Sequence, residues 1–289
     1  AMLTAESGDI ETIGIYINEC RRMGLNILPP SINESFHAFT IAKEDGVALD
    51  KSRTIRFGLY TIKNLGGDIA DAIIAERKAR GPFTTIDNFL DRMTHKNLNK
   101  KSMEALIKTG AFDDLGERNN LLATSEALLE YNREYARKSD SQSSLFSIGL
   151  TQHQLQLTPT EPATLTEKLN WEKELLGLYI SGHPLDNFAK RLEGKNTIEE
   201  IKKSKKKTGI IQIGAIIEEI RKVQTKTGEF MAFLKLSDKT GSIEAVIFPK
   251  NFREFIKIVE SSPTLGIAGR TTVRNNEKSI VIEKVIALV

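Results

Sequence analysis

The stretch Phe57-Gly58-Leu59-Tyr60-Thr61-Ile62-Lys63-Asn64-Leu65-Gly66-Gly67-Asp68 decides how the helical part of the chain folds. Helical periodicity precedes Asn64-Leu65-Gly66 and resumes after it, as far as Arg77. This is the pattern of a helix–hairpin–helix, a DNA-binding motif. Asn64 replaces the usual first glycine of the hairpin, and asparagine tolerates the left-handed backbone conformation that the turn requires.

The turn residues predict contacts with a nucleic-acid backbone. Small residues there let N–H groups at the start of the second helix approach a phosphate, which positions a duplex without reading its sequence. The residues expected to contact duplex DNA are Lys63, Asn64, Leu65, Gly66 and Gly67. The alternative is an ordinary helical hairpin that contacts no ligand.

Further helices and short strands are expected around this motif. Periodic isoleucines predict a helix from about Gly8 to Met23, whereas Phe36–Ile41 and Thr54–Phe57 are typical of strands. A second helical pair, Asn99–Lys108 and Arg118 to about Tyr131, has the form of a degenerate second hairpin. Its basic edge is either a further DNA contact or a solvated face; the residues of that edge are Lys96, Lys100 and Lys101.

A polar run from 138 to 166, rich in Ser, Thr and Gln, is expected to be a linker. Within it, Gln142, Leu145 and Phe146 form a short docking peptide. The two apolar side chains would enter a pocket on a partner, and the Gln142 amide would fix the register. The alternative is a linker with two incidental hydrophobic residues.

The segment after the linker predicts another helix, Leu165 to Tyr179, anchored by Trp171. His183 precedes a proline at the end of this helix, where a capping or packing role is expected. The four histidines and the single cysteine show no metal-ligand or catalytic spacing, so no catalytic residue, metal site or cofactor is expected.

From about Gly209 the hydrophobic period changes to two, which predicts three strands, a helix from Pro249, and two more strands. This order matches an OB-fold, a small barrel that binds oligonucleotides on one face and on its hairpin loops. Alternation is expected to place Phe230, Ala232, Leu234 and Leu236 inside, with Met231 facing outward. The residues expected to contact single-stranded DNA are Arg221, Lys222, Lys226, Phe233, Lys235 and Arg274. The alternative is a barrel that serves only as a spacer.

The totals favour an α+β multidomain protein, in which a helical helix–hairpin–helix domain precedes an all-β OB-fold barrel with one helix. The chain has 289 residues, an ordinary 40% of apolar residues and a net charge of +3. No apolar run is long enough to suggest a membrane partner, and one cysteine fits a cytoplasmic setting.

Several motifs together resemble one family, the bacterial replicative DNA polymerase III alpha subunit. The matching motifs occur in collinear order at Glu19–Gly24, Leu28–Asn33, Ile55–Gly66, Gly81–Phe83, Leu106–Asp113, Trp171–Gly177 and Ser181–Asp186. The resemblance implies the end of a fingers domain at 1–50, a helical clamp-binding domain at 51–200 and an OB-fold domain at 201–289. It also implies that Gln142, Leu145 and Phe146 dock on the sliding clamp.

The resemblance implies a DNA-directed DNA polymerase by parentage. The family's palm domain, whose aspartates hold two Mg ions, has no counterpart in this sequence, so a C-terminal fragment without polymerase activity is expected. Contacts with other replisome subunits are expected through missing regions. Two alternatives remain open, a standalone nucleic-acid-binding accessory protein and a structural scaffold without affinity for DNA.

Overall fold

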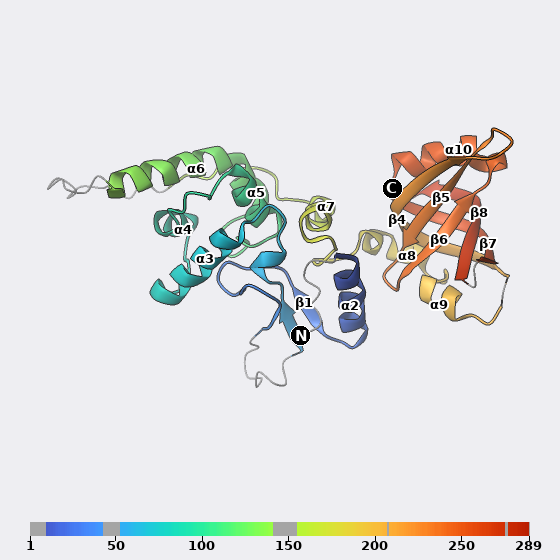
Figure 1. The fold of residues 1–289 in the computed structure, drawn as a ribbon, viewed down its shortest axis with the longest axis horizontal. Coiled ribbons are helices and arrows are strands. Elements are labelled where there is room, and N and C mark those ends of the chain that lie inside the picture. The colour runs from blue at the N-terminus through green and yellow to red at the C-terminus, as the bar shows by residue number, and fades with distance from the viewer. Residues whose placement is uncertain (1–9, 43–52, 141–154, 207, 275–276, 289) are drawn as a thin grey trace. The chain divides into compact units, whose positions relative to one another are not determined.

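The computed structural model describes residues 10–42, 53–140, 155–206, 208–274 and 277–288 (Figure 1). The chain forms two compact units, one up to Gly182 and one from His183 onward. The expected helical domain followed by a barrel is confirmed. The finer division with boundaries near 50 and 200 stays a prediction.

The first unit is mainly helical, with one small three-stranded sheet in the order β1-β3-β2. Its elements are α2 (Ile10–Arg22), β1 (Asn26–Leu28), β2 (Thr40–Ile41), β3 (Thr54–Arg56), the 3-10 turn η2 (Leu59–Thr61), α3 (Gly67–Arg80), α4 (Ile86–Arg92), α5 (Lys100–Lys108), α6 (Arg118–Asp140) and α7 (Leu165–Leu176).

Two sequence expectations near the hairpin are wrong. The strand expected at Phe36–Ile41 is reduced to Thr40–Ile41, and the helix expected before the hairpin is only η2. Both differences have one cause. The carbonyls of Phe36 and His37 accept hydrogen bonds from the N–H groups of Leu59 and Tyr60, so the two segments pair locally instead of extending.

Aromatic and aliphatic side chains from several helices form one core. Phe89 lies at its centre, with its ring 5.1 Å from the ring of Phe83 and 4.8 Å from that of Phe112. Helix α3 buries Ile69, Ala70, Ile73 and Ile74. A local signal sets the start of α4, since Thr85 caps the helix by accepting a hydrogen bond from the Asn88 N–H group.

Both described ends of the segment expected to be a polar linker, 138–140 and 155–166, belong to the helical unit. Helix α6 continues to Asp140, beyond the expected end near Tyr131. Residues 155–164, which we call the strap, lie along α6. Their N–H groups donate to side chains of that helix, from Thr158 to Thr124 and from Thr160 to Asn120, and to the residue just before it, from Ala163 to Glu117. These polar residues therefore satisfy backbone groups instead of filling a core.

Helix α7 begins at a capping box formed by Thr164 and Glu167, and it ends at Gly177. Gly177 has φ of +81°, a left-handed conformation that stops the helix before the expected Tyr179. Trp171 is only half-buried, whereas its neighbour Glu172 is fully buried. The Glu172 carboxylate accepts hydrogen bonds from the N–H groups of Ile180 and Ser181 and so holds the chain after α7.

The second unit is a closed barrel in the order β4-β5-β6-β8-β7, with antiparallel pairs except for the parallel pair β6–β8. His183 caps its first turn, since the imidazole accepts from the Leu185 N–H group. The elements are η3 (Pro184–Phe188), α8 (Ala189–Leu192), α9 (Ile198–Lys203), β4 (Ile210–Gln224), β5 (Phe230–Ser237), β6 (Ser242–Ile247), α10 (Pro249–Ser261), β7 (Thr264–Arg274) and β8 (Glu277–Ala287).

The barrel interior follows the predicted alternation with one exception. Ala232, Leu234 and Leu236 are buried as expected, but Phe230 is 52% exposed. Phe230 pairs with Gln224 at the far end of the β4–β5 ribbon, and its ring stacks on Phe252 of α10 at 5.9 Å. The placement of Phe230 inside the barrel is therefore wrong, because the ribbon extends past the barrel wall at this residue.

Candidate nucleic-acid interface

The hairpin between η2 and α3 adopts the backbone conformation that the sequence predicts. Asn64 has φ of +67°. The Lys63 N–H group donates to the Leu175 carbonyl at 3.0 Å, and the Leu65 side chain is buried. The Lys63 N–H hydrogen bond and the buried Leu65 therefore hold the hairpin against the helical core. The side chains of Lys63 and Asn64 and the backbone of Gly66 and Gly67 are exposed.

The start of α3 offers backbone donors beside a carboxylate. Gly66 is the N-cap residue and forms no side-chain cap, and its carbonyl accepts from the N–H groups of Ile69 and Ala70. The Asp68 carboxylate accepts from the Ile69 N–H group at 3.0 Å. A hydrogen bond from Asn97 lowers the pKa of Asp68, and the Ile69 N–H group and His95 lower it further. The Asp68 carboxylate also lies beside Gly66, where an added Cβ would be 2.5 Å from its Oδ1 atom, so an anion at this backbone would have to displace that side chain.

The loop between α5 and α6 is closed by its own side chains. Arg118 is 3% exposed, donates to both carboxylate oxygens of Asp113 and also donates to the Lys108 carbonyl. Gly110 has φ of +82°, and a Cβ there would lie 2.2 Å from the Arg118 guanidinium. This second hairpin therefore differs from the first, because a protein cation already occupies the loop.

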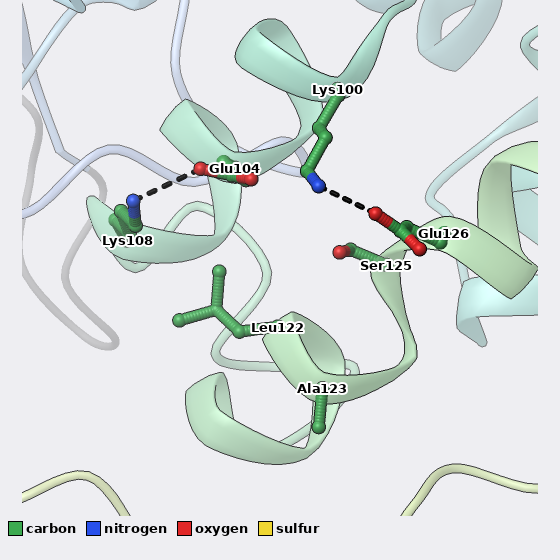
Figure 2. A pocket seen from close by; sticks show the side chains of 7 residues that line it. All are labelled: Lys100, Glu104, Lys108, Leu122, Ala123, Ser125 and Glu126. Atoms are coloured by element: carbon green, nitrogen blue, oxygen red, sulfur yellow. Dashed lines mark hydrogen bonds and ion pairs between the residues drawn. The ribbon is translucent and has the colours of Figure 1, made fainter.

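One residue of the basic edge, Lys100, is ion-paired, as is the nearby Lys108. Figure 2 shows a shallow depression between α5 and α6 in which Lys100 faces Glu126 and Lys108 faces Glu104, at 2.6 and 3.0 Å. Each cation has an acidic neighbour, which favours the solvated-face interpretation for Lys100. Lys96 and Lys101 are exposed.

The outer face of the barrel brings together an aromatic ring and a cation. Arg221 of β4 pairs with Phe233 of β5, and its guanidinium lies 5.1 Å from the centre of the ring. The neighbouring pair is Val223 and Met231, which extends the apolar surface toward the β4–β5 hairpin. The exposed Lys226 belongs to that hairpin. This arrangement suits a nucleotide strand, with bases on the rings and phosphates beside the cations.

Other expected contacts on the barrel lie in different surroundings. Lys235 is flanked across the sheet by Glu219 and Glu244, which reduces the local positive charge. Lys222 alternates to the opposite side from Arg221 and forms an ion pair with Glu260 of α10. The structure therefore does not bring Lys222 together with Phe233.

The remaining expected residues lie at the limits of the structure. Arg274 ends β7, and its side chain is outside the described part, as are Gln142, Leu145 and Phe146. Val223 and Met231 also belong to this face and are not among the expected contacts. The alternation that places Met231 on the outside is the sequence signal for them.

Within the described residues, no cluster of His, Cys, Asp or Glu side chains could hold a metal ion. Over the same residues, none of the helices is long and apolar enough to span a bilayer.

Comparison with known proteins gives two family matches. Residues 24–121 match a helix-hairpin-helix motif, and residues 208–288 match an OB-fold nucleic acid binding domain. These ranges contain the hairpin and the barrel face described above.

Similarity also extends over nearly the whole chain. The DNA polymerase III subunit alpha of Bacillus subtilis is 34% identical over 98% of this chain and 24% of its own length. The corresponding proteins of Borreliella burgdorferi and Aquifex aeolicus are 33% and 35% identical, over 99% and 92% of this chain and 25% and 21% of their own lengths. The chain thus spans about a quarter of the length of the curated relatives that it matches.

Proposed function

We propose that the chain binds DNA and docks on the sliding clamp for a bacterial DNA polymerase III. It is homologous to the alpha subunits of such polymerases over about a quarter of their length. The observation that carries this proposal is the match over 98% of the chain, in which hairpin and barrel occur in the same order. Each of the three contacts in this proposal has separate support.

Duplex DNA is the proposed ligand of the first hairpin. The left-handed Asn64 turns the chain so that Gly66 caps α3 and Gly67 begins it, both with exposed backbone, and Lys63 adds a cation beside them. Phosphate contacts of this kind are independent of base sequence. They suit a protein that moves along DNA of any sequence.

Single-stranded DNA is the proposed ligand of the barrel. Arg221 and Phe233 form a cation–aromatic pair on the outer face, and Val223 and Met231 continue it toward Lys226. Stacking on an aromatic ring tolerates every base, as a template strand requires.

The sliding clamp is the proposed partner of Gln142, Leu145 and Phe146. These residues lie between the end of α6 at Asp140 and the start of the strap at Leu155. The strap returns along α6 through hydrogen bonds to Thr124, Asn120 and Glu117, so the peptide leaves and rejoins the same helical unit. Binding there would make re-engagement of DNA effectively intramolecular.

Nucleotidyl transfer by the whole polymerase is assigned to regions outside the part that this chain matches. We infer that this chain alone has no nucleotidyl-transfer activity and needs no cofactor, with Mg ions belonging to a palm domain outside the matched region. Other replisome subunits would contact the polymerase through regions beyond this chain, and the setting would be the cytoplasm.

The decisive experiment measures binding of the chain to the sliding clamp of the same organism by calorimetry. A variant with Gln142, Leu145 and Phe146 changed to Ala is compared with a control in which Leu150, Gln152 and Gln154 are changed to Ala. Binding lost only in the first variant supports the tether. Equal binding by both variants would place the docking site elsewhere.

Two other functions make different predictions in a parallel DNA-binding assay. A standalone nucleic-acid-binding protein would bind DNA and show no affinity for the clamp. A structural scaffold would bind neither ligand. The exposed hairpin backbone and the Arg221–Phe233 pair favour DNA binding over the scaffold.

A further inference from the structure

Three rings lie along helix α3, beginning beside the hairpin, and we call them the aromatic strip: Tyr60, His37 and Phe36. The Tyr60 ring lies over the start of α3, where a Cβ added at Gly67 would be 3.4 Å from it. Its hydroxyl donates to Asp71 at 2.8 Å, and the His37 ring lies edge-on at 5.0 Å. None of these rings has a role in the contacts proposed above.

The strip is held in place by its backbone. The Leu59 and Tyr60 N–H groups donate to the Phe36 and His37 carbonyls at 2.8 and 3.1 Å. A Cβ at Gly58 would lie 2.4 Å from the His37 carbonyl oxygen, so this close approach of two segments requires glycine. The rings therefore come from two segments that lock against each other.

The far end of the strip combines a ring with two cations. The Phe36 ring is 5.1 Å from the Arg77 guanidinium carbon and 5.6 Å from the Lys78 ammonium nitrogen. Arg77 donates to the carbonyls of Ile32 and Ser35, so its guanidinium is fixed beside the ring. Lys78 is exposed and remains available to a phosphate.

The strip has the length of several nucleotides. Gly67, Asp71 and Lys78 lie close to one face of α3, and the eleven helical steps from Gly67 to Lys78 correspond to roughly 16 Å. Stacked bases repeat about every 3.4 Å along a strand. Tyr60 and Phe36 are 51% and 41% exposed, so both present ring surface to solvent.

The charges along the strip favour a nucleic acid over an apolar peptide. Lys63 lies at the hairpin end, and Arg77 and Lys78 lie at the other. Asp71 accepts the Tyr60 hydroxyl and pairs with His37 at 2.8 Å, which orients the two rings. Two further carboxylates near the strip have partners of their own, since Asp68 accepts from Asn97 and Glu34 pairs with Arg56. A strand would place bases on the rings and phosphates beside the cations.

We propose that the aromatic strip binds a single-stranded segment of DNA that continues from the duplex held by the hairpin. The inference rests on the proposed DNA-gripping function and assigns this unit a preference for a duplex–single-strand junction. The single strand on the strip is separate from any strand bound by the barrel.

Fluorescence anisotropy with three DNAs tests the proposal: a blunt duplex, the same duplex with a single-stranded overhang, and one with an abasic overhang. The full chain is expected to bind the normal overhang on the order of tenfold more tightly than the other two DNAs. Phe36→Ala and Tyr60→Ala should each remove most of this preference and leave binding to blunt duplex unchanged. Ile41→Ala, which removes an exposed apolar side chain outside the strip, should change neither.

Repeating the assay in a Phe233→Ala background distinguishes the contribution of the barrel to overhang binding from that of the strip. An overhang preference that persists there and falls on changing Phe36 supports the strip. A preference that Phe233→Ala abolishes, or that survives the double change of Phe36 and Tyr60, overturns it. Weaker blunt-duplex binding by Lys63→Ala reports on the hairpin alone. Failure of duplex binding by the hairpin is therefore distinguishable from failure of single-strand binding by the strip. Absence of any overhang preference in the unmodified chain also overturns the proposal.

Discussion

The Arg118 guanidinium donates to both carboxylate oxygens of Asp113, at 2.8 and 2.7 Å, and this pair closes the loop between α5 and α6. The same guanidinium lies 3.9 Å from Glu172, whose side chain is fully buried. One cation thus connects the start of α6 with the Asp113 loop and with α7. The two hairpin loops of this unit therefore differ. The first leaves its backbone exposed, whereas the second is occupied by the Arg118 guanidinium.

Removal of this cation should destabilise the helical unit. Arg118→Ala leaves the Glu172 carboxylate buried without its positive neighbour, and the expected loss is about 3 kcal/mol in the free energy of unfolding. Trp171 is the only tryptophan, so its fluorescence reports on unfolding of this unit. Lys100→Ala breaks the exposed pair with Glu126 and should cost less than about 1 kcal/mol. Equal losses in the two variants would contradict the assigned role of Arg118.

Substitutions at two glycines distinguish the energetic cost of backbone strain from the cost of disrupted packing. Gly110 and Gly24 have φ of +82° and +76°, but a Cβ at Gly24 meets no atom within 4 Å. Gly24→Ala should therefore cost about 1–2 kcal/mol from conformation alone. Gly110→Ala should cost more, because its methyl group would displace the Arg118 guanidinium. Denaturant unfolding followed by Trp171 fluorescence measures both values, and matching losses would show that packing at Gly110 is unimportant.

Asn64 provides a test of the hairpin conformation. Asn64→Gly should preserve or slightly increase stability, since glycine adopts φ of +67° without strain. Asn64→Ala should cost about 1 kcal/mol and weaken duplex binding by shifting Gly66 and Gly67. Thermal unfolding and duplex titration give the two readouts. If Asn64→Ala binds duplex as well as Asn64→Gly does, the turn conformation does not control binding.

The strap should loosen in acid through Glu117. Burial alone would raise the pKa of this carboxyl, but N–H donors from Ala163, Asn120 and Asn119 lower it below 4.5. A lowered folded-state pKa adds stability that is present above 4.5 and is lost as the pH falls through the folded value. Glu117→Gln should be less stable at neutral pH, with the difference from wild type shrinking in acid. Amide exchange at Ala163 measures the strap directly, and a difference that does not change with pH would contradict this role.

Lys63 should contribute one phosphate contact. Lys63→Ala is expected to reduce the slope of log binding constant against log salt by about one for duplex DNA. Lys100→Ala is the comparison, because that ammonium is already paired with Glu126. Titrations at several salt concentrations give the slopes. An equal reduction in both variants would indicate binding along a broad basic edge instead of at the hairpin.

Features set by neighbouring residues were predictable from the sequence. The left-handed turn at Asn64, the Thr85 cap of α4 and the start of β5 at Phe230 all follow from backbone preferences or hydrogen bonds within a few residues. The OB-fold order followed from period-two alternation, because one strand face must be buried whatever its partner. Collinear motifs were sufficient to identify the related polymerases.

Only the tertiary structure decided which charges and rings remain available. Arg118 lies near the buried Glu172, which is distant in the sequence, and Lys222 pairs with Glu260 of α10. Phe230 lies outside the barrel interior, at the end of the β4–β5 ribbon, and stacks on Phe252. The aromatic strip likewise combines Phe36 and His37 with Tyr60 and α3. Sequence periodicity specifies the face of an element on which a side chain lies. The partner opposite that face depends on contacts between distant segments, which local preferences do not encode.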